Sequence, residues 1–208
     1  MKYSLLDIAF SGLMHDIGKF YQRTDIFSDL TDAEKDLTPI ANAGYHTHLH
    51  SGYTSKFFRK YLKRFDGFER ITSSHHLPNT DEFSRILKDA DCIASAIDRK
   101  DEDNDTEEKN RTGAFQVVRL SSVMSEIDFG EERHNAKFNL DSFSSGEYPL
   151  ANYQIKSKVD SVDEYKTLWN KFINDLKDSE EELFKEDITK YNFDRLYSLL
   201  YEYATYIP

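Results

Sequence analysis

Histidine and aspartate side chains gather in the first half of the chain in a pattern that suits a metal ion. Asp16 and Asp91 lie in segments with the apolar periodicity of helices. Six of the seven histidines lie in the same region: His15, His46, His48, His50, His75 and His76. Imidazole and carboxylate groups suit divalent manganese, iron, cobalt, nickel or zinc. The pattern predicts a metal site able to polarise a phosphate ester and activate water.

The adjacent pair His15-Asp16 carries the most information, in the segment GLMHDIGK at positions 12–19. Neighbouring side chains on a helix point about 100° apart, so the pair can bind one ion from two directions, or Asp16 can bridge two ions. Gly18 is expected to end the helix and to allow a close backbone approach. Lys19 follows as a cation placed to meet a phosphate. The alternative is that His15 and Asp16 only cap a helix end.

His75, His76 and Asp91 are the next candidate ligands. Pro78 disfavours helix at the residue before it, which predicts that His75-His76 lies at a helix end or in a loop. Adjacent side chains in an extended segment point in opposite directions, so one histidine would bind metal while the other faces substrate. Asp91 is expected to face inward, where a carboxylate must be paired or bind a metal. Exposed loop histidines and a salt bridge from Asp91 are the alternatives.

His46, His48 and His50 alternate along the chain just before a predicted helix. His50 is nearest to that helix and is the better candidate ligand. His46 and His48 are equally well explained as surface residues, so their roles stay open.

The first hundred residues are expected to form helices that hold these groups. Apolar spacing predicts helices over 5–18, 51–65 and 83–97, and Thr31 begins a capping box that would open a short helix. The helix over 51–65 has a basic face that either guides a nucleic acid strand or is simply solvated: Lys56, Arg59, Lys60, Lys63 and Arg64.

The second half of the chain has a different texture. The acidic run DEDNDTEE at 101–108 predicts a solvated loop. Short strands are expected over 115–123, 137–140 and 153–155, and helices over 162–176 and 193–200. The fold class is therefore mainly α, with a helical bundle followed by a smaller α+β segment of short strands and C-terminal helices. The expected boundaries are 1–100 for the bundle, 101–113 for an acidic linker and 114–208 for the remainder.

The composition limits the cellular compartments and the binding partners that the protein is expected to have. The 208 residues carry a net charge of −11, which argues against a protein that coats nucleic acid through its own basic side chains. Cys92 is the only cysteine, which excludes an internal disulfide and a cysteine-based zinc cluster and suits a reducing cytoplasm. No segment approaches the roughly 20 apolar residues of a membrane span.

Three motifs, together with His50 before a helix, resemble one protein family closely: LMHDIGKFYQR at 13–23, SSHHLPN at 73–79 and DADCIASAIDRK at 89–100. The family is the large subunit of type III CRISPR effector complexes of the Csm kind, which begins with an HD nuclease domain. The usual HD arrangement has a histidine upstream of the His-Asp pair. This chain has none, which fits the rearranged order of the family.

The resemblance implies an HD-domain bundle that degrades single-stranded DNA when the complex binds target RNA. It implies a divalent transition metal, manganese or nickel, as one or two ions held by His15, Asp16, His50, His75 and Asp91. Asp16 would bridge, and His76 or Lys19 would contact the scissile phosphate. The implied partners are other subunits of the complex, with guide RNA held through the complex.

Two other functions remain open from the sequence. A stand-alone HD phosphohydrolase would act on nucleotides without RNA, and a catalytically silent scaffold would only dock other subunits. The Gly-Gly-Asp-Asp motif with which the family makes cyclic oligoadenylates is absent, so that activity is not expected of this chain.

Overall fold

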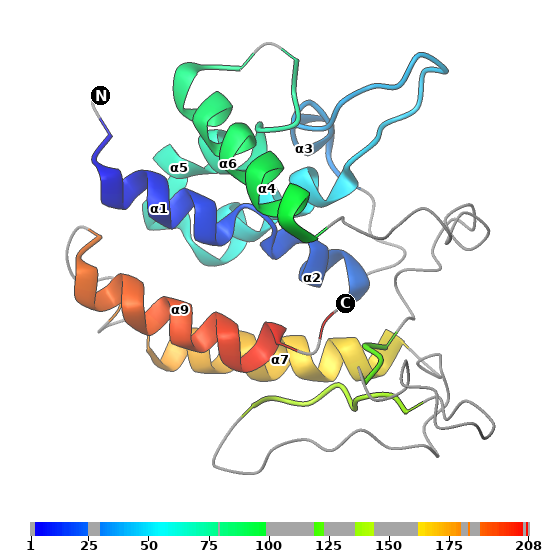
Figure 1. Cartoon of the computed structure of the whole chain (residues 1–208), viewed down its shortest axis with the longest axis vertical. Coiled ribbons are helices and arrows are strands. Elements are labelled where there is room, and N and C mark those ends of the chain that lie inside the picture. The colour runs from blue at the N-terminus through cyan, green and yellow to red at the C-terminus, as the bar shows by residue number, and fades with distance from the viewer. Residues whose placement is uncertain are drawn as a thin grey trace. The chain divides into compact units, whose positions relative to one another are not determined.

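The structure is a computed structural model, and it describes residues 3–24, 30–78, 80–98, 119–122, 136–143, 162–179, 183, 188–205 and 207. The described residues are mainly helical, as the sequence predicts (Figure 1). The chain divides into two compact units. Unit 1 comprises Met1–Gln22, Phe27–Asn110 and Ile188–Lys190, and unit 2 comprises Arg23–Ile26, Arg111–Asp187 and Tyr191–Pro208.

Unit 1 holds all the candidate ligands, on its helices and in the turns that follow them. These are α1 (Leu5–Met14), most of α2 (Ile17–Thr24), α3 (Asp32–Lys35), α4 (Leu49–Tyr61), the 3-10 turn η1 (Lys63–Phe65), α5 (Asp66–Ser73) and α6 (Glu82–Asp98). The capping box expected at Thr31 is confirmed, since the Thr31 backbone N–H donates to the Glu34 carboxylate at 2.8 Å. Helix α4 packs against α3 and α5, and α1 packs against α5 and α6.

Aromatic rings fill the core of unit 1. Phe10 of α1 lies 6.2 Å from Phe58 of α4 and 5.4 Å from Phe65 of η1, measured between ring centroids. Phe10, Phe57 and Phe58 are almost fully buried. Tilted and edge-to-face ring pairs of this kind add to the hydrophobic stabilisation of a core. The core therefore fixes α1, which ends just before His15, and α4, whose first turn contains His50.

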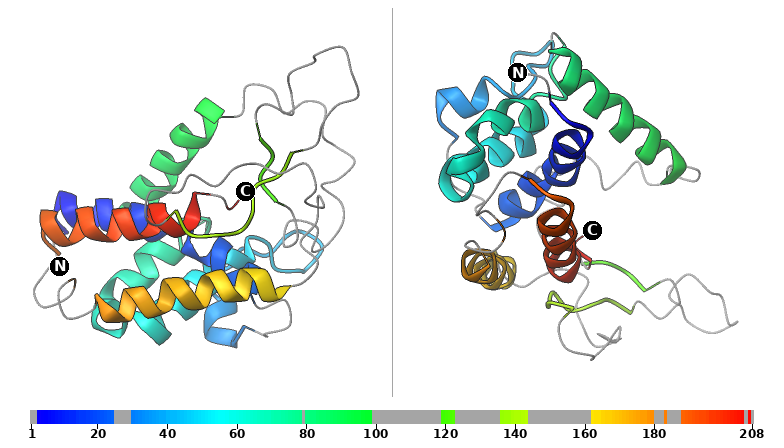
Figure 2. Two further views of the ribbon diagram at one scale, coloured as in Figure 1. Left: turned by 90° about the horizontal axis from the view of Figure 1, so that it is seen from below. Right: turned by 90° about the vertical axis from the view of Figure 1, so that its left-hand side faces the viewer.

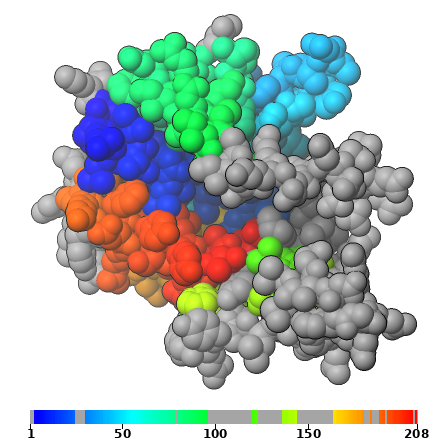
Figure 3. All heavy atoms as spheres, in the orientation of Figure 1, coloured from blue at the N-terminus to red at the C-terminus, as the bar shows by residue number. Residues whose placement is uncertain are grey.

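The structure corrects three expected features of these helices. Helix α1 ends at Met14, so His15 and Asp16 form a turn, and Gly18 lies in the first turn of α2 rather than at the C-terminal end of a helix. Helix α4 ends at Tyr61, before the turn η1. Helix α6 buries Ser84 and Leu87, whereas Ile86 and Ile93, two apolar residues of the segment predicted as a helix, are 42% and 66% exposed. The outer face of α6 is visible on the surface in Figure 3.

Unit 2 contains α7 (Val162–Asp178) and all but the first residue of α9 (Lys190–Ala204), and the two helices run antiparallel side by side (Figures 1 and 2). Phe172 of α7 lies 5.7 Å from Tyr203 of α9 between ring centroids, and the Tyr203 hydroxyl donates to the Asp175 carboxylate. These two helices confirm the predicted C-terminal helices.

The short strands of the predicted α+β segment are not found in the part of the second half that the structure describes. That part has a single antiparallel bridge between Ser121 and Lys137, with the Ser122 N–H donating to the Ala136 carbonyl at 2.9 Å. The expected strand at 153–155 and the acidic linker at 101–113 lie outside the described residues.

Candidate metal centre

His15 stands in the turn that joins α1 to α2, at the C-cap of α1. Its Nδ1 lies 2.7 Å from the carbonyl oxygen of Gly12. A carbonyl oxygen can only accept, so Nδ1 carries the proton and Nε2 of the neutral ring carries a lone pair. That Nε2 is buried and has no hydrogen-bond partner.

His75 repeats the same arrangement at the end of α5. Its Nδ1 lies 2.9 Å from the carbonyl oxygen of Thr72, its side chain is 0% exposed, and its Nε2 also has no hydrogen-bond partner. The two rings lie 5.1 Å apart between centroids. Metal-binding histidines are typically held in this way, with one ring nitrogen on a backbone carbonyl and the other on the metal. Two buried imidazoles therefore present unsatisfied Nε2 atoms in the same place.

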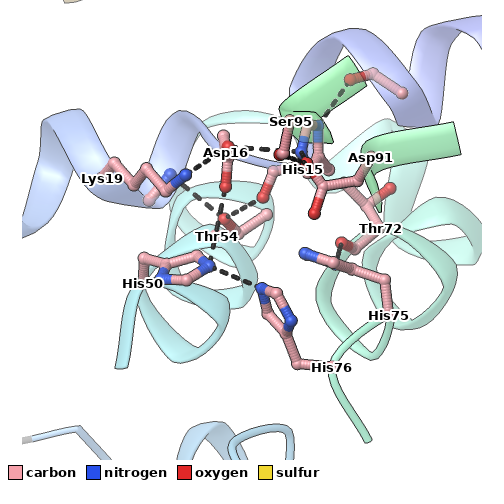
Figure 4. A network of polar contacts seen from close by, with 12 residues as sticks. His15, Asp16, Lys19, His50, Thr54, Thr72, His75, His76, Asp91 and Ser95 are labelled. Atoms are coloured by element: carbon pink, nitrogen blue, oxygen red, sulfur yellow. Dashed lines mark hydrogen bonds and ion pairs between the residues drawn. The ribbon is translucent and has the colours of Figure 1, made fainter. Parts of the chain in front are cut away.

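The carboxylates of Asp16 and Asp91 face these nitrogens (Figure 4). The His15 Nε2 lies 3.2 Å from Asp16 Oδ2 and 3.5 Å from Asp91 Oδ1. Asp91 also accepts a hydrogen bond from the Ser95 hydroxyl at 3.3 Å, one turn along α6. Lone pairs that face one another in a buried place need a positive charge between them, either a proton or a metal ion. The ligand atoms of His15, His75 and Asp91 all lie within 4.8 Å of one another.

His50 and His76 form the second part of the centre. Their Nε2 atoms lie 3.0 Å apart, and the His50 Nε2 is 3.6 Å from Asp16 Oδ1. His50, His75 and His76 offer ligand atoms that again lie within 4.8 Å of one another. His75 thus belongs to both groups, and Asp16 contacts His15 on one side and His50 on the other. Nitrogen and oxygen donors of this kind fit a divalent transition metal.

Thr54, which no pattern in the sequence singled out, fixes the His15-Asp16 turn to α4. Its buried hydroxyl donates to the His15 carbonyl at 2.9 Å and accepts from the Gly18 N–H at 3.0 Å. Gly18 allows this approach, because a Cβ there would stand 1.9 Å from the His50 carbonyl oxygen. The expected close backbone approach at Gly18 is confirmed. The sequence feature that could have identified Thr54 is its position one turn after His50 on a predicted helix.

Burial and charge keep the imidazoles neutral where ligands are needed. Burial lowers the pKa of His50 to about 3 and the pKa of His76 to about 3, since a protonated ring would lose its hydration. Burial, followed by the neighbouring His15, also lowers the pKa of His75. A neutral imidazole is the form that binds metal.

The pKa values of His15 and Asp16 shift so that the charged form of each side chain is favoured. Burial opposes the charge on His15, but the nearby Asp16 carboxylate outweighs it and raises the pKa of His15. Burial likewise opposes the charge on Asp16, yet His15 and Lys19 hold the pKa of that carboxyl far below its usual range. Both shifts favour a positive charge between His15 and Asp16, which either a proton or a metal ion can supply.

Lys19 lies beside this cluster as the sequence suggested. Its ammonium is 2.6 Å from Asp16 Oδ2, and its side chain is 53% exposed. The basic face of α4 is partly engaged elsewhere, because Arg59 pairs with Glu69 at 2.7 Å and Lys60 lies over the Tyr61 ring.

The structure separates the three alternating histidines. His50 joins the cluster, whereas His46 Nδ1 hydrogen-bonds the Thr38 hydroxyl at 2.6 Å. His48 is the N-cap of α4 with a φ of 50°, and its exposed ring lies 4.1 Å from the His76 ring. A left-handed histidine is uncommon, and such backbone strain concentrates at functional sites.

The structure also corrects the expected orientation of the His75 and His76 side chains. They lie in a turn after α5, as predicted, but their rings are 4.0 Å apart and do not point in opposite directions. Turn geometry, unlike extended backbone, lets consecutive side chains face the same place, so both rings lie next to His50.

The fold and the site together define a helical protein with a histidine- and aspartate-rich candidate metal centre. Over its whole length the chain is 25% identical to Cas10/Csm1 from Methanocaldococcus jannaschii, described as a CRISPR system single-strand-specific deoxyribonuclease of subtype III-A. The chain spans only 24% of the length of that relative. No family model and no solved structure matches the chain. The similarity indicates a distant relationship to Cas10/Csm1. Among the described residues, no helix is both long and apolar enough to cross a membrane.

Proposed function

We propose that unit 1 is an HD-type nuclease domain whose centre binds one or two divalent transition-metal ions, manganese or nickel. The observation that carries the proposal is the convergence of the buried Nε2 atoms of His15 and His75 on the Asp16 and Asp91 carboxylates, with each ring fixed by an Nδ1 hydrogen bond to a backbone carbonyl. Asp91 and His50 complete the two ligand groups, and Asp16 between them is the candidate bridging ligand.

The proposed chemistry is hydrolysis of a phosphodiester. A bound divalent ion lowers the pKa of water and polarises the phosphate. The residues of the chain orient the ligands and receive the substrate. Lys19, held by Asp16 and half exposed, offers an ammonium to the scissile phosphate, and His76 offers a neutral ring at the partly exposed side of the cluster.

Single-stranded DNA is the proposed substrate, and a type III CRISPR interference complex is the proposed setting. The distant similarity to a single-strand-specific deoxyribonuclease supports the substrate. The motif resemblance further implies activation by target RNA and association with other subunits. The net charge of −11 agrees with partner subunits supplying much of the affinity for nucleic acid.

The test is cleavage of a labelled single-stranded DNA in manganese by the wild-type chain, by Asp91→Asn and by His46→Ala. Asp91→Asn keeps the shape of the side chain but removes its charge, and should lower the rate at least about 100-fold, because the ion is held less well. His46→Ala lies outside both ligand groups and should retain the rate. Manganese binding, measured by calorimetry on the same proteins, reports on the site independently of cleavage.

The same experiment separates the rival functions. Hydrolysis of nucleotides but not of DNA would identify a stand-alone phosphohydrolase. Manganese binding without cleavage, also in the assembled complex with target RNA, would identify a scaffold with a silent site. Equal activity of Asp91→Asn and wild type would reject the proposed centre.

A further inference from the structure

A surface hollow of about 530 Å³ opens on unit 1 directly after the His75-His76 turn. Its apolar part is Leu77 and Pro78, which follow His76 in the chain. Its other lining residues are polar or charged: Thr80, Arg85, Lys88 and Asp89. The volume lies in the range of pockets that hold small molecules, about 300–1,000 Å³.

The hollow is linked to the metal centre along the chain, because its lining residue Leu77 directly follows His76. The His76 ring belongs to the centre, 3.0 Å from His50 between Nε2 atoms, and also lies 4.1 Å from the His48 ring between centroids. Lys88 of the hollow and Lys19 of the centre both act electrostatically on His48. Two cationic side chains, one from the centre and one from the hollow, therefore lie within electrostatic reach of the same histidine.

Arg85 and Lys88 lie three residues apart on α6, so both side chains emerge on neighbouring parts of one helix face. Within the described residues, neither side chain has an ion-pair partner, although Asp89 shares the hollow and offsets part of their charge. Arg85 and Lys88 thus add local positive charge in a chain whose net charge is −11. Charge of this sign attracts the phosphates of a nucleic acid strand.

We infer that the hollow binds the nucleotide unit next to the cleaved bond, with Arg85 and Lys88 on its phosphate and Leu77 and Pro78 against its sugar or base. This inference rests on the proposed nuclease function, and it adds to that function a binding subsite on α6. Phosphate contacts position a strand without reading its sequence. The subsite therefore favours a polynucleotide over a small phosphodiester, whatever its base sequence.

The test is the double substitution Arg85→Ala/Lys88→Ala, compared with the control Arg70→Ala/Lys166→Ala, which removes the same two side-chain types from exposed positions outside the hollow. We expect the KM for a single-stranded oligonucleotide to rise about tenfold, with kcat within about twofold of wild type. Hydrolysis of bis(p-nitrophenyl) phosphate, which has no neighbouring nucleotide, should not change. An unchanged KM, or equal decreases on both substrates, would overturn the subsite.

A binding measurement decides the inference even if the proteins do not cleave. Fluorescence anisotropy of a labelled oligonucleotide, recorded in the His75→Ala background over a range of salt concentrations, should give a weaker affinity for the Arg85/Lys88 variant. The slope of log affinity against log salt should shrink by about 0.7 for each phosphate that the variant no longer neutralises. An unchanged slope would reject the subsite, whereas absence of cleavage with the predicted slope change would reject only the nuclease function.

Discussion

At the scale of single residues, the two histidines with unpartnered Nε2 atoms define the centre. Each ring is held by a backbone carbonyl three residues earlier, Gly12 for His15 and Thr72 for His75. A buried ring nitrogen without a partner is unfavourable, so natural proteins rarely keep one without a role. A divalent ion, as proposed, would satisfy both nitrogens and the carboxylates that face them.

Replacement of His75 by alanine should reduce manganese affinity more than any other single histidine change, because His75 belongs to both ligand groups. The decrease should exceed the roughly 10- to 100-fold that removal of an outer-sphere partner costs. Calorimetric titration of His75→Ala and of the control His46→Ala measures the difference. Equal affinities for the two variants would show that His75 does not bind the ion.

The metal-free protein should lose stability as the pH falls from about 7 to about 5. His50 and His76 have folded pKa values of about 3, below the value of 6.5 for an unfolded chain, so the unfolded state binds more protons in this interval. Each contributes at most about 2 kcal/mol at pH 5, and His76 less because it is partly exposed. His15, with a raised pKa, opposes the trend.

Urea unfolding in the presence of a chelator checks this pH dependence. The change in unfolding free energy between pH 7 and pH 5 should be smaller in His50→Gln/His76→Gln than in wild type. A wild-type protein that is equally stable at both values would contradict the assignment of neutral, buried rings.

At the scale of elements, the turn between α1 and α2 is held on α4 by Thr54 and Gly18. The Thr54 hydroxyl donates to the His15 carbonyl and accepts from the Gly18 N–H. The same contact brings the His15-Asp16 turn next to His50, one turn before Thr54 on α4. The geometry of the centre thus depends on a backbone approach that only a residue without a side chain permits.

Gly18→Ala should destabilise the protein by at least about 1–3 kcal/mol, the usual range for overpacking, because the added Cβ would stand 1.9 Å from the His50 carbonyl oxygen. Gly67→Ala is the matched control, since its Cβ meets no atom within 4 Å, and it should be neutral or stabilising by up to about 1 kcal/mol. Chemical denaturation of both variants gives the comparison. Equal effects of the two changes would argue against the close contact of α2 with α4.

Local patterns predicted most of these elements, and tertiary contacts decided the rest. Apolar spacing was enough to place α4, α6, α7 and α9, and the Thr31 capping box located α3. The break after Met14 was missed because residues 5–18 keep a helical apolar pattern, and the contact with Thr54 that accompanies the turn is not visible in the sequence. The exposure of Ile86 and Ile93 on α6 was missed for a related reason. Periodicity predicts which residues share a helix face, but it does not predict which element, if any, covers that face.

The candidate ligands were easier to predict than their arrangement. The clustering of histidines and the His15-Asp16 pair were sufficient to nominate groups that the structure brings together, including Asp91. The turn at His75-His76 and the separation of His46 from His50 depend on backbone geometry, including the left-handed φ of His48. Ion number and the bridging role of Asp16 remain predictions.

At the scale of the whole molecule, two properties bear on how the proposed function is tested: the net charge of the chain and the share of its relative that the chain spans. The chain has a net charge of −11, so we assign the local attraction of a strand to Lys19 at the centre and to Arg85 and Lys88 in the proposed subsite. The chain spans only 24% of the length of the relative from Methanocaldococcus jannaschii. The nuclease function proposed for this chain is therefore best tested both alone and with the other subunits of a complex.

Anomalous X-ray diffraction from crystals soaked in manganese tests the central claim most directly. We predict a peak within bonding distance of the Nε2 atoms of His15 and His75 and of the Asp91 carboxylate, and disappearance of that peak in His75→Ala. Manganese bound only at exposed acidic groups, with none at these three side chains, would contradict the proposed metal centre.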